Sequence, residues 1–164
     1  MKLFTAASAL VLMTLIPTLA SAQKMVILSR HAERADGAAT MGASTDPELS
    51  AAGKERAERL ATMLAEANVG AIFTTEFRRT KDTAAPLAAR AKVSAEVVPA
   101  GQLAALVDKI KARASDTVFV VGHSNTVPQI IKALGGPDVT IGDNEYSNLF
   151  IWVPATGTLT RLRY

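Results

Sequence analysis

The sequence contains no cysteine, and this absence excludes thiol nucleophiles, cysteine-ligated zinc and iron–sulfur clusters. A strong charge imbalance is also missing, because 18 basic residues are nearly matched by 15 acidic ones. The chain has no long basic run and no alternation of basic with aromatic residues, so nothing suggests binding to nucleic acid. Its 164 residues suffice for one domain with a hydrophobic core and are too few for two.

Residues 1–22 have the layout of a secretory signal peptide. Lys2 provides a positive start, an apolar run extends from Leu3 to Leu19, and the small residues Ala20-Ser21-Ala22 follow. A membrane anchor is the alternative, but a spanning helix needs about 20 apolar residues, and this run is shorter and contains a proline. We therefore expect a cleaved signal peptide, a periplasmic or secreted location, and a domain of residues 23–164 without a membrane span. That domain has 17 basic and 15 acidic residues, since Lys2 is the one charged residue removed.

The remaining residues alternate short apolar segments with amphipathic ones. Strands are expected at residues 25–29, 71–74, 96–98, 117–121, 147–153 and 158–163. Helices are expected from a Ser50 cap to a stop at Asn68–Gly70, and at residues 76–91, 102–113 and 127–134. The fold class is therefore α/β, a three-layer sandwich with a mostly parallel central sheet and helices on both faces. The last two strands flank Pro154–Gly157 and predict a C-terminal antiparallel hairpin at the edge of the sheet.

The chain has only two histidines, and each stands directly after an expected buried strand. His31 follows Val-Ile-Leu-Ser-Arg30, and His123 follows Val-Phe-Val-Val-Gly122. In an open α/β sheet, ligands bind in the crevice beyond the carboxyl ends of the strands. Parallel strands share that edge, so both histidines are expected to face the same crevice.

Arginines lie close to the same expected edge. Arg30 precedes His31, Arg34 follows three residues later, and Arg79 opens the helix after the second strand. A guanidinium group can donate two hydrogen bonds at once to the oxygens of one phosphate. Its positive charge also disfavours a protonated imidazole nearby, which keeps a histidine nitrogen free to attack. Ser124-Asn125-Thr126 opens a helix whose first N–H groups can bind an anion. For Arg34 and Arg78, a plain surface charge remains the alternative.

Four segments in this order resemble motifs of the histidine phosphatase superfamily, the phosphoglycerate-mutase-like group, and in particular its small single-domain phosphatases. They are Arg30-His31-Ala32-Glu33, Leu49–Gly53 with Arg56-Ala57, Thr75–Ala84 and Gly122-His123-Ser124-Asn125. The resemblance implies a phosphatase in which a ring nitrogen of His31 attacks phosphorus and water then hydrolyses the phosphohistidine. Arg30, Arg79 and His123 would hold the phosphoryl oxygens, and no metal or organic cofactor is implied.

Further residues match positions near the family's pocket or extend the expected phosphate site. We expect phosphate or substrate binding by Arg34, Thr75, Ser124 and Asn125. The expected partner is a phosphorylated small molecule or a phosphorylated component of the cell envelope. The segment between Thr83 and Thr117 is too short for a lid, which favours a shallow phosphatase site over a mutase site.

The sequence departs from the family pattern at two places. Ala32 replaces the glycine of the Arg-His-Gly signature. Many family members carry a proton-donating carboxylate shortly after the third strand, but Val97–Leu103 contains no acid. Glu33 is our candidate for the proton donor, and Asp36, Asp143 and Glu145 are the alternatives. Loss of general acid catalysis would narrow efficient substrates to those with good leaving groups.

Three different functions compete with this one. A phosphate-binding module on the same fold would need no proton donor. A serine hydrolase would use Ser124, because Gly122–Thr126 resembles a nucleophile elbow, but no histidine follows that serine. A metal site built from His31 and His123 would need nearby carboxylates, and the arginines would repel the cation.

Overall fold

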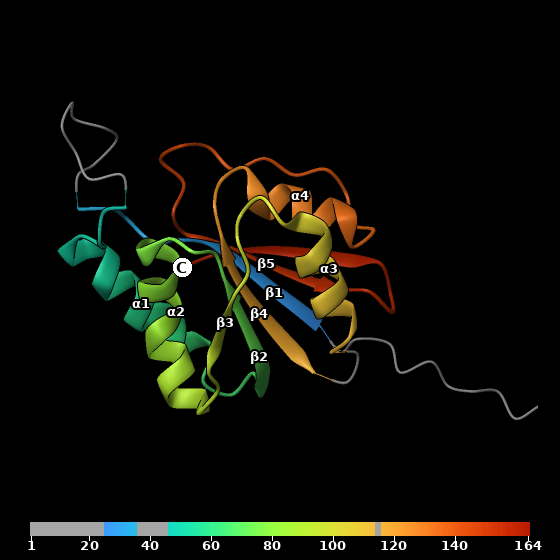
Figure 1. Ribbon diagram of the computed structural model, residues 1–164, viewed down its shortest axis with the longest axis horizontal. Helices are drawn as coiled ribbons and strands as arrows, with labels where there is room; N and C mark the ends of the chain where they lie inside the picture. The colour runs from blue at the N-terminus through green and yellow to red at the C-terminus, as the bar shows by residue number, and fades with distance from the viewer. Residues whose placement is uncertain (1–24, 36–45, 114–115) are drawn as a thin grey trace, which may run out of the picture.

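The computed structural model describes residues 25–35, 46–113 and 116–164. The strands are β1 (Met25–Arg30), β2 (Val69–Thr74), β3 (Ala95–Val97), β4 (Thr117–Gly122), β5 (Asn148–Val153) and β6 (Thr158–Arg163). The helices are α1 (Ala51–Met63), α2 (Arg78–Ala91), α3 (Leu103–Lys111) and α4 (Thr126–Ala133). One pair of helices, α1 and α2, covers one face of the sheet, and α3 and α4 cover the other (Figure 1). This arrangement confirms the expected α/β sandwich.

The strands form one mixed sheet in the order β3-β2-β4-β1-β5-β6. The first four strands of this order are parallel, and β5 and β6 add the expected antiparallel hairpin at the edge. In the pairing of β1 with β4, Arg30 lies opposite Gly122. The two strands therefore end at the same level, and the residues that follow them, His31 and His123, emerge side by side.

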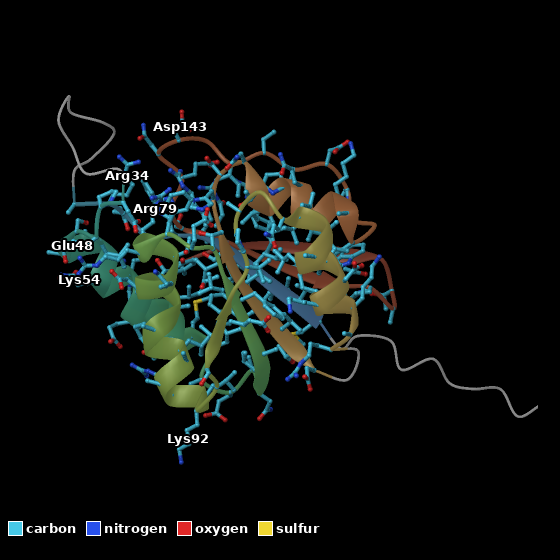
Figure 2. The ribbon with its side chains drawn as sticks, viewed as in Figure 1. Arg34, Glu48, Lys54, Arg79, Lys92 and Asp143 are labelled. Atoms are coloured by element: carbon cyan, nitrogen blue, oxygen red, sulfur yellow. The ribbon has the colours of Figure 1, made fainter. Side chains whose placement is uncertain are left out.

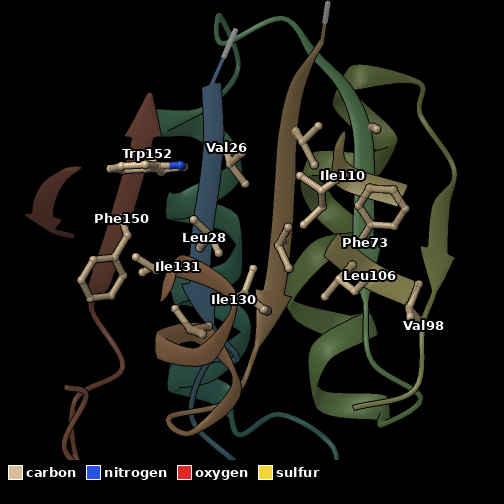
Figure 3. Packing of buried hydrophobic residues seen from close by; sticks show 14 of the residues in the cluster. Val26, Leu28, Phe73, Val98, Leu106, Ile110, Ile130, Ile131, Phe150 and Trp152 are labelled. Atoms are coloured by element: carbon tan, nitrogen blue, oxygen red, sulfur yellow. The ribbon is translucent and has the colours of Figure 1, made fainter. Parts of the chain in front are cut away.

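Alternating residues of the central strands build two hydrophobic cores. Val26 and Leu28 of β1 pack beneath α3 and α4, whereas Ile27 packs beneath α1 and α2. Figure 3 shows the first of these cores, in which side chains from α3 and α4 meet those from the sheet. Its helical members include Leu106, Ile110, Ile130 and Ile131. Burial on both faces explains why β1 and β4 read as nearly continuous apolar runs.

The expected elements are all present, with one correction at the end of the first helix. The helix ends at Met63, and Val69 and Gly70, which were expected to stop it, belong instead to β2. Asn68 provides the break with a left-handed backbone (φ 51°), which asparagine tolerates well. The expected signal peptide lies outside the described residues. Within the described ranges, no helix is long and apolar enough to cross a membrane.

The start of α1 is attached to the segment that follows His31. The Ser50 side chain accepts a hydrogen bond from the Gly53 N–H (3.0 Å), as expected for the cap, and the Ser50 N–H donates to the Glu33 carbonyl (2.9 Å). A Cβ atom at Gly53 would collide with that carbonyl, so only glycine allows this close approach. The helix thus fixes the backbone two residues beyond the histidine.

Candidate active site

His31 is held at the end of β1 in one defined orientation. Its backbone N–H donates to the Gly122 carbonyl (2.9 Å), which extends the pairing of β1 with β4. The ring is almost completely buried, with 4% of the residue exposed, and Nδ1 lies 2.8 Å from the Ala32 carbonyl oxygen. A carbonyl oxygen can only accept, so Nδ1 carries the proton and Nε2 keeps its lone pair. The Ala32 N–H donates to the Thr83 hydroxyl (2.9 Å), which fixes the peptide that orients the ring.

Both histidines are electrically neutral in the folded protein. The pKa of His31 is lowered to about 3, mainly by burial and also by electrostatic interaction with His123, Arg30 and Arg79, while the hydrogen bond to Ala32 opposes the shift. Burial also lowers the pKa of His123 to about 4, with further lowering by Arg79 and Arg30 and an opposing effect of Glu76. Neutral imidazoles at physiological pH agree with the expectation that nearby arginines keep a ring nitrogen free.

His123 lies beside His31, as the topology predicts. The two ring centroids are 5.3 Å apart, with an angle of 65° between the ring planes. His123 Nε2 is 3.0 Å from the Thr75 hydroxyl, which is 2.9 Å from the hydroxyl of Thr80. The Phe77 ring packs edge-on against the imidazole at 5.3 Å. Residues from the end of β2 and the start of α2 therefore set the position of the second histidine.

Arg30 is buried, and the loop before β5 holds its guanidinium group. Nη1 donates to the carbonyl oxygens of Gly142 (2.9 Å) and Asp143 (2.7 Å), and the guanidinium lies 4.1 Å from the centre of the Tyr146 ring. The Tyr146 ring also lies 6.0 Å from that of His31. Sequence reasoning did not identify Tyr146, because it stands in a loop that matches no motif.

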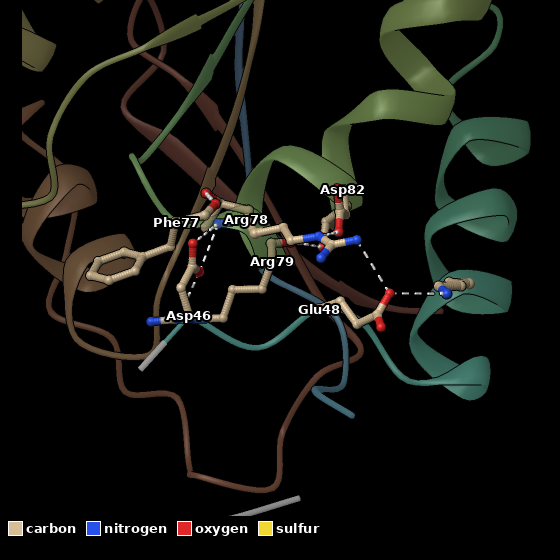
Figure 4. Close-up of polar contacts among 9 residues, drawn as sticks. Asp46, Glu48, Phe77, Arg78, Arg79 and Asp82 are labelled. Carbon is tan, nitrogen blue, oxygen red and sulfur yellow. Dashed lines mark hydrogen bonds and ion pairs between the residues drawn. The ribbon is translucent and has the colours of Figure 1, made fainter. Parts of the chain in front are cut away.

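Arg79 and Arg78 are neighbours in sequence but differ in their surroundings. The Arg79 side chain is 12% exposed and forms an ion pair with Asp46 (3.7 Å), and its guanidinium lies 4.2 Å from the centre of the Phe77 ring (Figure 4). The Arg78 side chain is 56% exposed and forms ion pairs with Glu48 and Asp82, each at 3.3 Å. Of the two, Arg79 lines the cleft with the histidines.

These side chains surround a cleft of about 390 Å³ at the carboxyl ends of β1 and β4. Its lining includes the expected site residues Arg30, His31, Arg34, Arg79, His123, Ser124 and Asn125. The side chains of Arg34, Arg79 and Asp143 come from three separate segments and gather at this end of the molecule (Figure 2). Thr75, also expected at the site, lies behind His123 as its hydrogen-bond partner. The cleft thus combines two neutral imidazoles with three guanidinium groups.

The model of the histidine phosphatase superfamily (branch 1) matches residues 26–103. The matched segment contains three of the four motifs that resemble this superfamily, including Arg30, His31 and Arg79. The expectation of a phosphoric monoester hydrolase of this type is thus confirmed at the level of the family. A comparison with curated proteins gives no match in sequence.

Several solved structures of phosphatases have the same fold. The protein histidine phosphatase SixA, complexed with tungstate, has a TM-score of 0.64 and 18% identity over 84% of this chain and 94% of its own. Mycobacterial glucosyl-3-phosphoglycerate phosphatase Rv2419c with inorganic phosphate has a TM-score of 0.62 and 17% identity, over 78% of this chain and 88% of its own. Phosphoserine phosphatase from Entamoeba histolytica with 3-phosphoglyceric acid has a TM-score of 0.63 and 16% identity, over 85% of this chain and 95% of its own. These similarities establish the fold of the chain.

The candidate proton donors named from the sequence have different surroundings. Arg56 holds the Glu33 carboxylate with hydrogen bonds of 2.6 and 2.8 Å, beside α1 rather than in the cleft. Burial raises the pKa of Glu33, but these bonds outweigh it and keep the pKa below its usual value. Glu145 accepts from the Gly142 N–H and from Arg163, which lowers its pKa to about 2. Asp143 lines the cleft, and Asp36 lies outside the described residues.

A serine hydrolase and a metal enzyme find little support in the geometry. Ser124 lines the cleft, but within the described residues neither imidazole hydrogen-bonds to it: His123 Nε2 contacts Thr75, and His31 Nδ1 contacts Ala32. Among residues 25–35, 46–113 and 116–164, no three carboxylate or histidine side chains are grouped so that they could hold a metal ion. The cleft instead presents fixed cations, which suit an anion.

Buried neutral histidines predict that this protein loses stability as the pH falls. The pKa of each is near about 6.5 in an unfolded chain, and about 3 and about 4 in the folded protein. Below pH 6.5 the unfolded chain therefore binds protons that the folded chain does not, so the free energy of unfolding decreases as the pH is lowered. Each histidine adds a slope of up to about 1.4 kcal/mol per pH unit.

Urea unfolding between about pH 7.5 and 5 measures this dependence, in a range chosen to lie above most carboxylate titrations. His31→Asn and His123→Gln each remove one titrating group and are expected to flatten the curve. A variant with the same slope as the unmodified protein would contradict a buried neutral imidazole at that position.

Proposed function

We propose that this protein hydrolyses phosphomonoesters through a phosphohistidine intermediate on His31. The observation that carries the proposal is the hydrogen bond between His31 Nδ1 and the Ala32 carbonyl. It leaves the Nε2 lone pair free in a cleft whose guanidinium groups suit a phosphoryl group. A neutral nitrogen nucleophile beside fixed cations is the arrangement that phosphoryl transfer to histidine requires.

The reaction has two steps in this proposal. The Nε2 lone pair attacks phosphorus, the bond from phosphorus to the ester oxygen breaks, and the alcohol leaves with a proton. Water then attacks phosphorus, the bond from phosphorus to Nε2 breaks, and inorganic phosphate is released. Arg30, Arg79 and His123 surround the phosphoryl oxygens and stabilise the charge that shifts onto them in each transition state.

The side chains of the cleft are already held in place before a substrate binds. Two carbonyl oxygens and the Tyr146 ring fix Arg30, while Asp46 and the Phe77 ring fix Arg79. Such preorganisation matters because charges that need not reorient lower the barrier most effectively. Thr75 serves the same purpose for His123.

The substrate proposed is a phosphorylated small molecule or a phosphorylated component of the cell envelope. Solved structures with this fold include phosphatases named for glucosyl-3-phosphoglycerate and phosphoserine, which supports the first class. The second class, and a periplasmic or secreted location, depend on residues 1–22 acting as a cleaved signal peptide and on residues 23–164 forming the mature domain. Fractionation of cells that produce the protein, with N-terminal sequencing of the product, tests both points.

A binding module without turnover is the second candidate function. It is favoured by one observation, namely that the loop after β3, Val98–Gln102, contains no acid to protonate a leaving group. Such a protein would bind phosphate in the cleft and form no phosphoenzyme.

Trapping the intermediate separates these functions. The purified protein is mixed with a reactive phosphomonoester, quenched in alkali, where phosphohistidine survives, and digested for mass spectrometry. We expect phosphate on the peptide that contains His31. Phosphate binding without a phosphoenzyme or phosphate release would establish the binding module. A Ser124 adduct with a fluorophosphonate would overturn the proposal in favour of a serine hydrolase, and activity that chelators abolish would overturn it in favour of a metal enzyme.

A further inference from the structure

The proposed reaction needs a proton for the leaving alcohol, and the loop after β3 does not provide one. Val98–Gln102 contains no carboxylate, although its Ala100 lines the cleft. Departure of an alkoxide without a proton is slow, and general acid catalysis is typically worth about 10²- to 10⁴-fold. A carboxylate brought to this loop by another element would meet the need.

Glu76 is such a carboxylate. Its Oε2 accepts a hydrogen bond from the Ala100 N–H (2.8 Å), so the end of β2 delivers an acid directly to the loop after β3. Its two neighbours in sequence both contact His123, Thr75 through its hydroxyl and Phe77 through its ring. The side chain is exposed to solvent, and Ala100, to which it is hydrogen-bonded, lines the cleft.

Charge and anchoring distinguish Glu76 from the other candidates. In its ionised form, Glu76 acts on His123, where it opposes the lowering of the pKa by burial and by the arginines. Glu33 is bound by Arg56, and Glu145 is bound by Arg161 and Arg163. Asp143 lines the cleft, but its contact with the site is the hydrogen bond that its backbone oxygen accepts from Arg30.

We propose that Glu76 is the proton donor to the leaving group, acting from the end of β2 in place of an acid in the loop after β3. The inference rests on the proposed phosphatase function and adds the residue that completes it. The hydrogen bond to Ala100 engages Oε2 and leaves Oε1 to carry the proton. Sequence reasoning did not select Glu76, because its link to the loop after β3 is formed only in the folded chain.

Glu76 gives up one proton in the first step and takes one back in the second. In the first, His31 Nε2 forms a bond to phosphorus, the ester bond breaks, and the proton of the Glu76 carboxyl group moves to the departing oxygen. In the second, water attacks phosphorus and gives its proton to the Glu76 carboxylate, while the bond from nitrogen to phosphorus breaks. The carboxyl group and the imidazole are both regenerated, and the products are an alcohol and inorganic phosphate.

The test compares two substrates with different needs for a proton. Glycerol phosphate has a poor leaving group that requires protonation, whereas 2,4-dinitrophenyl phosphate has a good one that does not. Glu76→Gln keeps an oxygen that accepts from the Ala100 N–H but holds no transferable proton. We expect kcat/KM for glycerol phosphate to fall about 10²-fold, and kcat/KM for the dinitrophenyl ester to change less than about threefold.

Two control variants carry the same loss of charge. Glu96→Gln changes an exposed carboxylate on β3 that forms an ion pair with Lys109, and we expect no change on either substrate. Asp143→Asn changes an acidic residue in the lining of the cleft. Thermal unfolding of each variant shows whether the fold is intact.

Each outcome bears on the assignment. An equal loss on both substrates, or no loss on either, overturns the role of Glu76, and so does a loss confined to glycerol phosphate in Asp143→Asn. Failure of the proposed function has a different signature, because the unmodified protein would then form no phosphohistidine from the dinitrophenyl ester, which needs no proton donor.

Discussion

His31→Ala is expected to abolish formation of the phosphoenzyme and to lower kcat/KM by at least about 10³-fold, even for a substrate with a good leaving group. The effect is large because, in the proposed mechanism, the variant removes the atom that forms the bond to phosphorus. His31 Nε2 is kept unprotonated by the hydrogen bond at Nδ1 and by a pKa of about 3. Rapid-quench and steady-state kinetics with a dinitrophenyl ester measure the two losses.

The control for this experiment is the second histidine. His123→Ala removes a group that contacts the phosphoryl oxygens in the proposed mechanism but leaves the nucleophile in place. We therefore expect slow formation of phosphohistidine in this variant and none in His31→Ala. Phosphoenzyme formed at normal rates by His31→Ala would show that another residue accepts the phosphoryl group.

Arg79→Leu is expected to lower kcat/KM about 10²- to 10³-fold, the usual cost of removing one preorganised donor to transition-state charge. Its guanidinium lines the cleft and is fixed between Asp46 and the Phe77 ring. Most of the loss should appear in kcat, because the charge on the oxygens shifts during the reaction. Arg79→Lys keeps the charge but loses the planar fork, so an intermediate loss is expected.

Arg78→Leu is the matched control, because it makes the same change one residue earlier. Arg78 is exposed and its ion pairs with Glu48 and Asp82 lie outside the cleft. We expect its kinetic constants to stay within about twofold of the unmodified protein, since surface ion pairs are worth little. Equal losses in the two variants would mean that general electrostatic attraction, rather than a positioned guanidinium, explains the role of Arg79.

Features encoded by local patterns were predictable from the sequence. The apolar runs at β1 and β4 specify buried parallel strands, and a histidine after each is placed at the shared edge by the topology alone. Arg30 and Arg79 follow from the same reasoning, as does the helix cap at Ser50. The α/β sandwich and the gathering of Arg30, His31, Arg79 and His123 at one edge therefore required no knowledge of tertiary contacts.

Features that depend on contacts between distant loops were not predictable. Tyr146 packs on Arg30 across more than a hundred positions, and no local pattern marks it. Glu76 reaches the loop after β3 through one hydrogen bond to a backbone N–H, which any residue at position 100 except proline would provide. Glu33 is adjacent to the signature motif, yet Arg56 of α1 holds its side chain beside that helix. Side-chain direction was the missing information in all three cases.

The place of β1 in the sheet governs when this site is assembled during synthesis. Met25 of β1 pairs with Thr117 of β4, and Val26 pairs with Trp152 of β5. The strand that is synthesised first among those described therefore pairs with two strands that are synthesised much later. Closing such long loops is slow, because the entropy cost precedes the gain from contacts. A nascent chain that has not yet reached β4 contains His31, the proposed nucleophile, but neither His123 nor the strand that supports His31. The cleft with both histidines is therefore complete only after translation has passed His123 and the sheet has closed around β1.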